Sequence, residues 1–428
     1  MSFATPTFRL MASGAQMLFV AFGALVLVPL LTGLDPSVAL FTAGLGTLLF
    51  QVVTKRTIPI FLASSFAFIA PIAASVKNWG VSDTMGGLFA AGLVYMLLAF
   101  AVRFKGAGFI HRWMPPVVTG PVIMVIGLGL APVAVNMALG KSGDGSLTLY
   151  PYAEAIWVSM AALTATLSAA VFAKGVFKLV PILFGVMTGT LIASFTGMVS
   201  VETVAQAPWF AMPNFVLPTF NWQAVLFMIP VAIAPAVEHV GDILAISNIT
   251  GKRYLQKPGL HRTLFGDGLA TSAAACFGGP PNTTYSEVTG AVMLTRSFDP
   301  RVMTWAAVFA IAVAWFAKFG SALQTIPTPV MGGIMILLFG SIATVGLNTL
   351  VKAQIDLAKS RNLVIVSTTL VFGIGGMVFG QGEFTLQGIS LCSVVAILLN
   401  AALPNKDPID DSLSEEQAIV DDIIEHSK

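Results

Sequence analysis

The chain is a succession of apolar runs, and these runs restrict it to the membrane. Soluble domains carry about 25% charged residues, whereas this chain of 428 residues is only 10% charged and 56% hydrophobic. A helix of about 20 apolar residues crosses a bilayer, so the pattern predicts an all-α polytopic membrane protein with about 14 spans. The runs cover residues 12–31, 37–53, 58–76, 85–102, 115–135, 152–173, 179–199, 222–247, 263–279, 281–295, 302–320, 329–349, 362–380 and 386–404.

The remaining composition excludes several other classes of protein. Cys276 and Cys392 both lie in apolar runs, as packing residues do, and the four histidines are scattered, so neither a disulfide nor a metal site is predicted. No small-residue cleavage site follows the first run, which is therefore expected to be a span and not a signal peptide. Residues 405–428 are acidic and polar, and we expect a solvated cytoplasmic tail there.

Lys and Arg are distributed unevenly between the two sides that the runs define. With the N-terminus in the cytoplasm, 17 of the 22 fall in cytoplasmic loops, 2 in the tail, and only Lys77, Lys141 and Lys318 on the other side. Cytoplasmic loops of membrane proteins carry such an excess. The distribution therefore supports 14 spans and predicts cytoplasmic N- and C-termini in a cell (inner) membrane.

One short motif occurs twice. Residues 116–123 (PVVTGPVI) and 329–336 (PVMGGIMI) share the pattern P-V-x-x-G-x-x-I at an offset of 213 residues. They lie in the fifth and twelfth runs, and the odd spacing makes the two copies enter the membrane from opposite sides. This predicts a 7+7 inverted repeat, a common architecture of secondary transporters.

Two runs at corresponding places in the two halves look interrupted. The third contains SSFAFIAP at residues 64–71, and the tenth contains PPNTTYSE at residues 280–287, which is short and polar for a span. Paired interrupted spans indicate a transporter's binding site, because freed backbone groups can bind substrate there. The alternative for residues 280–286 is an ordinary extracellular loop.

Four carboxylates lie in the apolar runs away from their ends: Glu238, Asp242, Asp267 and Glu287. An ionisable group at this depth costs roughly 3 kcal/mol or more and usually faces a polar cavity, which predicts a transporter of a small polar molecule driven by protons. Glu238 and Asp242 are one helical turn apart, so at least one of the pair should hold a proton near neutral pH. The alternative is a carboxylate pair bonded to the backbone of a broken helix.

The side chains near these acids have expected roles of their own. An ionised Glu accepts two N–H donors side by side, as a planar amide-containing ring presents them, and Phe66 and Tyr285 either stack on such a ring or pack. Asp267 is flanked by Gly266 and Gly268, and a role in a network is favoured over substrate contact. His239 points away from Glu238 on the helix, which favours a packing role.

These motifs together resemble the nucleobase–cation symporter-2 family, also called nucleobase–ascorbate transporters, and most closely its bacterial uracil permeases. The similarity extends over nearly all of the predicted spans. The matching segments are VEHVGD at 237–242, SSFAFI at 64–69, PNTTYSE at 281–287, and the signature that runs from Glu287 through Gly290 to Thr295-Arg296.

The resemblance implies a fold and a site. The fold has a core domain (1–113 and 201–325), a gate domain (114–200 and 326–404) and short antiparallel strands in spans three and ten. Substrate would contact Glu238, Glu287, Tyr285, Ser65 and backbone amides near Phe66 and Ser286, with Phe339 on the gate side. Glu238, Asp242 and Asp267 would serve proton coupling, and the protein would be a homodimer.

The chain departs from uracil permeases at several positions. At four positions the residue differs from that of uracil permeases: Asp242 and Met17 each replace a His, Val288 replaces an Asn of the signature, and Phe339 replaces a Tyr. Asp267 is a residue that resembles those of the purine-transporting branch of the family at this position. Glu287, in contrast, stands where purine transporters usually have Gln. We therefore expect proton-coupled uracil uptake by alternating access, without a cofactor.

The alternatives are a xanthine-type purine symporter of the same family and an anion transporter of the same architecture. The apolar runs hold acids but no Lys or Arg near their middles, which disfavours an anion. An enzyme is not predicted, because the chain has no Ser/His pair, metal-ligand spacing or protease motif.

Overall fold

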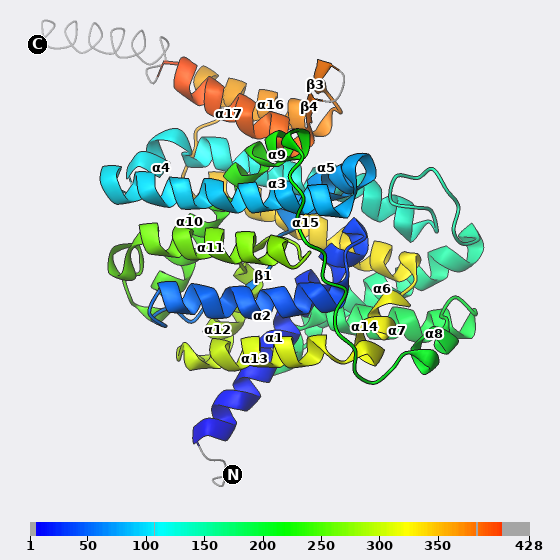
Figure 1. The fold of residues 1–428 in the computed structure, drawn as a ribbon. Coiled ribbons are helices and arrows are strands. Elements are labelled where there is room, and N and C mark those ends of the chain that lie inside the picture. Colours follow the sequence, from blue (N-terminus) through cyan, green and yellow to red (C-terminus); the bar gives the residue numbers. More distant parts are fainter. Residues whose placement is uncertain (1–5, 107, 382–383, 405–428) are drawn as a thin grey trace, which may run out of the picture.

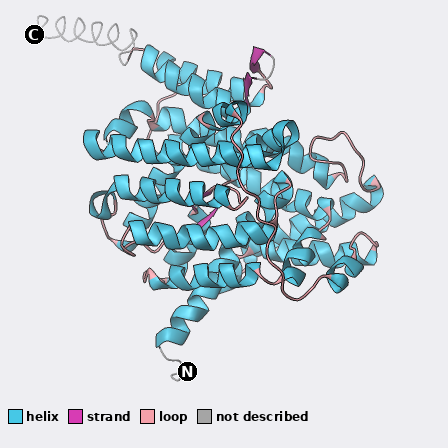
Figure 2. Ribbon diagram, viewed as in Figure 1, coloured by secondary structure: helices cyan, strands magenta, loops and turns pink. Residues whose placement is uncertain are grey.

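The chain folds mostly into helices, as a computed structural model shows for residues 6–106, 108–381 and 384–404 (Figures 1 and 2). The helices are α1 (Pro6–Thr32), α2 (Pro36–Val53), α3 (Ile69–Lys105), α4 (Gly108–Trp113), α5 (Pro116–Ala138), α6 (Tyr152–Phe172), α7 (Pro181–Phe195), α8 (Val201–Gln206), α9 (Trp222–Met228), α10 (Ile233–Thr250), α11 (Leu260–Cys276), α12 (Ser286–Thr295), α13 (Arg301–Ala314), α14 (Ala317–Gln324), α15 (Thr328–Lys352), α16 (Ser360–Ile374) and α17 (Gly388–Ala402). Short turns precede or join them: η1 (Phe66–Phe68), η2 (Gly175–Leu179), η3 (Pro230–Ala232) and η4 (Leu255–Gly259). The strands are β1 (Leu62–Ser64), β2 (Asn282–Thr284), β3 (Val378–Gln381) and β4 (Phe384–Gln387).

The multi-pass helical fold predicted from the apolar runs is confirmed. Each run contains a helix, and runs three and four share α3, whose backbone is non-helical at Gly80 (φ 81°). Within the described residues, seven helical segments are long and apolar enough to cross a membrane: Thr7–Thr32, Pro36–Val53, Phe66–Lys105, Pro116–Ala138, Tyr152–Phe172, Trp222–Thr250 and Thr328–Lys352. Helices α7, α13, α16 and α17 are shorter but also apolar. The predicted tail at 405–428 lies outside the described residues.

The strands predicted in spans three and ten are also confirmed. β1 and β2 pair antiparallel, with Leu62 opposite Thr284 and Ser64 opposite Asn282. A further bond, from Ser65 N–H to the Pro281 carbonyl at 2.9 Å, extends the pairing. Two segments more than 200 residues apart therefore meet among the helices (Figure 1).

The helices pack in two groups. α3 lies against α11, α2 lies against α11 and α13, and α1 lies against α13; in the other group α5 lies against α15, α16 and α17, and α6 lies against α7 and α15. The division into core and gate domains stays a prediction.

The two copies of the repeated motif open helices that pack along each other. α5 and α15 approach so closely at Gly127 that a Cβ there would lie 2.3 Å from the Phe339 carbonyl oxygen. Small residues permit such close approach between membrane helices.

A second strand pair, β3 with β4, is not among the expected elements. β3 begins within the run at 362–380, which was expected to be helical to its end. α16 ends at Ile374, and Gly376 follows it with a φ of 72°, a conformation that glycine adopts readily and that terminates helices. An apolar run alone does not distinguish a helix end from a short strand.

Candidate functional site

The β1–β2 pair is held in place by hydroxyl groups from two flanking helices. Thr47 of α2 accepts the Leu62 N–H at 3.0 Å and donates to the Leu62 carbonyl at 3.4 Å. Thr271 of α11 donates to the Asn282 carbonyl at 3.0 Å. These bonds satisfy strand backbone that would be costly to leave unpaired inside a membrane protein, and they fix where the chain leaves each strand.

Each strand leads into a helix within a few residues. After β1, Ser65 precedes η1 and α3; after β2, Tyr285 precedes α12, which begins at Ser286. The first turn of a helix has backbone N–H groups without intrahelical partners, and these attract polar or negative groups. The two junctions therefore bring free backbone donors toward one place.

A cavity of about 60 Å³ lies at these junctions. One water molecule needs roughly 10–15 Å³ on this measure, so the space suits a small molecule or several waters. From the junctions and α10 it is lined by Ser64, Ser65, Phe66, Ala67, Thr283, Thr284, Tyr285, Ser286, Glu287 and Glu238, and from α5 and α15 by Ile123, Ile126, Ser341, Ile342 and Val345.

The cavity lies between the two helix groups. One wall comes from the strand junctions and α10, and the opposite wall comes from α5 and α15.

Glu238 and Glu287 are the two carboxylates that line this cavity. Glu287, in the first turn of α12, is exposed to it, and Glu238 of α10 is half-buried. None of the residues lining the cavity is Lys or Arg. Acceptors without a neighbouring cation are suited to N–H donors of a neutral molecule.

Asp242 is directed to the second strand junction rather than to the cavity. Its side chain is buried and accepts hydrogen bonds from Thr284 Oγ1 at 2.8 Å and from the Ser286 hydroxyl. The carboxylate thus bonds to residues on both sides of Tyr285. Glu238 and Asp242 lie one turn apart as expected, yet they have different surroundings.

Asp267 and His239 form a fully buried pair. His239 Nδ1 lies 3.0 Å from Asp267 Oδ2, and both side chains are 0% exposed. The same Asp267 oxygen accepts the Thr284 N–H at 3.4 Å, and His239 Nδ1 lies 3.2 Å from Thr284 Oγ1. Asp267 therefore belongs to a network, as expected. His239 is buried, as a packing residue is, but it also contacts Asp267. Helical spacing did not reveal this contact, because Asp267 lies on another helix.

Thr284 connects these groups. Its N–H contacts Asp267, and its hydroxyl contacts both Asp242 and His239. Thr284 was not among the predicted site residues, although it stands in the quoted PNTTYSE segment. Its strand position, one residue before Tyr285, makes it the link between the buried acids and the cavity wall. No group of three or more His, Cys, Asp or Glu arranged to hold a metal ion occurs in the described part of the chain.

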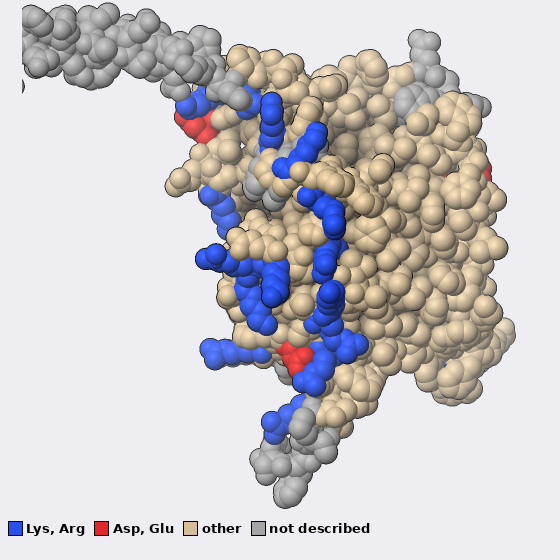
Figure 3. All heavy atoms as spheres, turned by 60° about the vertical axis from the view of Figure 1, so that its left-hand side comes forward, with Lys and Arg blue, Asp and Glu red and all other residues tan. Residues whose placement is uncertain are grey.

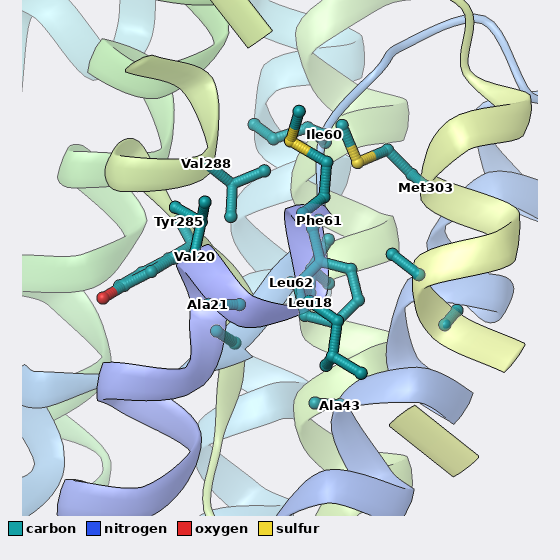
Figure 4. Close-up of a cluster of buried hydrophobic side chains, with 14 of the residues drawn as sticks. Leu18, Val20, Ala21, Ala43, Ile60, Phe61, Leu62, Tyr285, Val288 and Met303 are labelled. Carbon is teal, nitrogen blue, oxygen red and sulfur yellow. The ribbon is translucent and has the colours of Figure 1, made fainter. Parts of the chain in front are cut away.

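Tyr285 and Phe66 face each other from the two junctions. Their ring centroids are 6.2 Å apart with an interplanar angle of 49°. Tyr285 also joins a buried cluster with Val20 and Ala21 of α1 and Val288 of α12 (Figure 4). Tyr285 and Glu287 line a neighbouring apolar cavity of about 70 Å³ as well.

Among the residues predicted to contact substrate, Phe339 is the one that the structure does not bring to the cavity. Its side chain is 1% exposed and packs with a buried cluster that includes Leu130 and Ala134 of α5. Ser341, Ile342 and Val345, further along α15, line the cavity instead. These three were missed because their exposure depends on how α15 packs against the first helix group.

Comparison with known proteins agrees with this architecture. Residues 8–382 match the family model described as the permease family. The chain is 61% identical over 391 residues to the probable uracil permease of Pasteurella multocida (strain Pm70), covering 91% of this chain and 93% of that protein. It is 45% identical over 408 residues to the uracil permease of Bacillus caldolyticus, covering 94% of this chain and 93% of that protein.

Solved structures with much lower identity share the fold. The transmembrane domain of the cyanobacterial bicarbonate transporter BicA has a TM-score of 0.63 at 14% identity and covers 92% of this chain and 97% of its own. SLC26A9 has a TM-score of 0.69 at 11% identity, with coverage of 92% and 64%.

The fold, the paired strands and the cavity between two helix groups define a multi-pass membrane transporter. The chain belongs to the nucleobase–cation symporter-2 family of permeases.

Proposed function

We propose that this protein takes up uracil together with protons by alternating access across the inner membrane, with both termini in the cytoplasm. The observation that carries the substrate class is the pair of carboxylates, Glu238 and Glu287, on one small cavity without a cation. A probable uracil permease at 61% identity and a uracil permease at 45% identity support uracil as the substrate.

The polar atoms of the cavity complement a planar ring with adjacent N–H and C=O groups. Each carboxylate accepts N–H donors, and backbone N–H groups near Phe66 and Ser286 supply donors for ring carbonyl oxygens. Ser65 and the rings of Phe66 and Tyr285 complete the contacts that we propose for the core side. Phe339 is not part of this proposal, since its side chain lies in the α5–α15 packing.

The position of Asp242 and Asp267 bears on the purine alternative. Both residues resemble those that purine-transporting relatives carry at these positions, but neither of them lines the cavity. Their bonds go to Ser286, Thr284 and His239. The side chains that would distinguish a purine from uracil by contact are therefore Glu238 and Glu287, and Glu287 favours uracil.

Proton coupling is proposed from the continuity of the acids. Glu238 and Glu287 face the cavity, and Asp242 reaches the same junction through the Ser286 hydroxyl. A carboxyl that exchanges a proton on the cavity side would change the hydrogen bonds at the start of α12. Asp267 and His239 extend this network behind the strand.

The direct test is uptake of labelled uracil by proteoliposomes that contain the purified protein. We expect uptake to require a proton gradient directed into the vesicles, with the outside more acidic, and to be independent of sodium. Uptake that persists after the proton gradient is collapsed but needs sodium would exclude proton coupling. Labelled xanthine in the same assay tests the purine alternative, and bicarbonate or sulfate tests the anion alternative.

We also propose a homodimer formed through the gate domain. Large apolar side chains are exposed on α6 and α7, among them Trp157 (75%) and Phe195 (83%). Lipid covers such residues equally well, so the mass of the protein in a lipid nanodisc is the appropriate measurement. A single protein copy per nanodisc under conditions that preserve uptake would contradict the dimer.

A further inference from the structure

A second cavity, remote from the strand junctions, combines an apolar lining with cationic side chains. It measures about 200 Å³ and lies where α2 ends, α3 ends and α11 begins. Its lining residues are Val53, Ala99, Phe100, Arg103, His261, Arg262 and Phe265. None of them is acidic, so the net charge at this cavity is positive.

The apolar part of the cavity is built from two helices. Phe100 of α3 and Phe265 of α11 form an edge contact with centroids 6.3 Å apart and planes at 90°. Ala99 and Val53 supply the smaller side chains beside them. This arrangement leaves room next to the aromatic rings for a hydrocarbon chain.

One face of α3 carries a row of exposed apolar side chains that ends at this cavity. Leu93, Leu97, Phe100 and Phe104 are spaced four, three and four residues apart, so they lie along one face of the helix. Their exposed fractions are 43%, 67%, 52% and 80%. A continuous exposed apolar stripe on a membrane-spanning helix faces lipid tails. Phe100 belongs both to this stripe and to the cavity lining.

Cationic groups stand at the end of this stripe. Arg103 is in the last turn of α3, and His261 and Arg262 are in the first turn of α11. The positive end of the α11 dipole adds to their field. Gly259, at φ 103°, precedes them, and a Cβ there would lie 2.7 Å from the His261 ring, so this position needs glycine for His261 to pack against the turn.

Figure 3 shows Lys and Arg gathered on one side of the molecule, which is the side where α3 ends and α11 begins in Figure 1. Guanidinium groups bind phosphate through paired N–H donors, and basic pockets at the membrane edge bind anionic headgroups. A free phosphate would use the arginines but would leave the adjoining apolar surface without a role. An anionic phospholipid uses both parts.

We propose that this cavity, lined by Phe100, Phe265, Arg103, His261 and Arg262, is a binding site for one anionic phospholipid. The phosphate contacts Arg103 and Arg262, and an acyl chain lies along Phe100 and the outer face of α3. The site is separate from the cavity at the strand junctions and does not depend on the transported substrate.

The test is native mass spectrometry of the purified protein with added phosphatidylglycerol, without uracil. We expect Arg103→Gln/Arg262→Gln to weaken phosphatidylglycerol binding about tenfold or more, since two charge-assisted bonds are lost. The matched control is Lys174→Gln/Lys178→Gln, which removes two exposed cations elsewhere in the predicted cytoplasmic loops and should leave binding unchanged. Uracil binding by each variant reports whether it is folded.

A second variant separates a defined site from general attraction to positive charge. Val53→Trp fills the cavity and keeps every cation, so it should also weaken phosphatidylglycerol binding. Equal binding by wild type and Val53→Trp, or by wild type and the double arginine variant, would overturn the proposal.

Two further arms test the ligand class. Phosphatidylcholine should bind at least about tenfold more weakly than phosphatidylglycerol. The chain-free headgroup sn-glycerol 3-phosphate should not displace the lipid at equal concentration. Displacement at equal concentration would identify a phosphate site and would overturn the lipid assignment.

Discussion

The two strand–helix junctions follow similar paths but present different chemistry to the same cavity. After β1 the chain continues through Ser65, Phe66 and Ala67, whereas after β2 it continues through Tyr285, Ser286 and Glu287. The third residue after each strand is therefore Ala67 in one junction and Glu287 in the other. The predicted inverted repeat would account for the similar paths, and the four carboxylates near the junctions all belong to the second half of the chain.

The supports of the two junctions differ in the same way. β1 is fastened by the neutral hydroxyl of Thr47, while the junction after β2 contacts Asp242, Asp267 and His239. Bonds to charged groups are worth about 1.5–3 kcal/mol, compared with about 0.5–1.5 kcal/mol for neutral ones. A change of charge would therefore affect the second junction far more than the first. In the proposed proton coupling, the junction after β2 would be the one affected, while the junction after β1 would mainly shape the cavity.

The largest effect on uracil binding is expected at Glu287, which has no acidic counterpart in the junction after β1. Glu287→Gln places a donor against a ring N–H, which should cost about 1–3 kcal/mol and weaken uracil binding about 10- to 100-fold. Isothermal titration calorimetry gives the affinity, and the melting temperature should change little. Glu202→Gln, at an exposed position on α8, is the matched control. Normal uracil affinity in Glu287→Gln would remove Glu287 from the substrate contacts.

The next prediction compares the supports of the two junctions. Asp267→Ala leaves His239 Nδ1 and the Thr284 N–H without their carboxylate, so it should lower the free energy of unfolding by about 1–3 kcal/mol. Thr47→Val, which removes a neutral hydroxyl from Leu62, should lower it less. Denaturation in detergent micelles measures both. An equal or larger loss in Thr47→Val would contradict the proposed difference between the junctions.

A smaller effect on binding is expected at Asp242. Asn has nearly the same shape and can still bond to the hydroxyls of Thr284 and Ser286, so Asp242→Asn should bind uracil within about threefold of wild type. Because the group can no longer exchange a proton, uptake driven by a pH gradient should fall much more than binding. Binding and gradient-driven uptake that fall together would assign Asp242 a structural role alone.

Much of this architecture was predictable because its causes are local in the sequence. The cost of exposing apolar runs to water predicts the spans, and the cost of burying Glu238 or Glu287 in lipid predicts a polar cavity. The interrupted runs at residues 64–71 and 280–287 indicate where the cavity lies. Their pairing as strands came from the resemblance, and the structure confirms it.

The remaining features depend on contacts between distant elements. Helical spacing puts Glu238 and Asp242 on one face, but only the position of β2 decides that Asp242 meets Thr284 while Glu238 meets the cavity. The bond between His239 and Asp267 likewise joins two helices. The cavity wall formed by α5 and α15 could not be predicted from the sequence. An apolar residue such as Ile342 can either pack between helices or line a cavity, and residue type does not distinguish the two.

The smallest effect on uracil binding is expected on the cavity wall formed by α5 and α15, which also provides a control for the comparison of the junctions. Phe339 is buried in the α5–α15 packing, so Phe339→Leu should leave uracil binding within about twofold, although the packing change lowers stability. Ile342→Trp, in contrast, adds bulk to a residue that lines the cavity and should weaken binding more strongly. Calorimetry on both variants gives the comparison. A loss in Phe339→Leu as large as that in Ile342→Trp would mean that Phe339 reaches the substrate in another conformation of the transporter. The two strand junctions would then share substrate recognition with this wall.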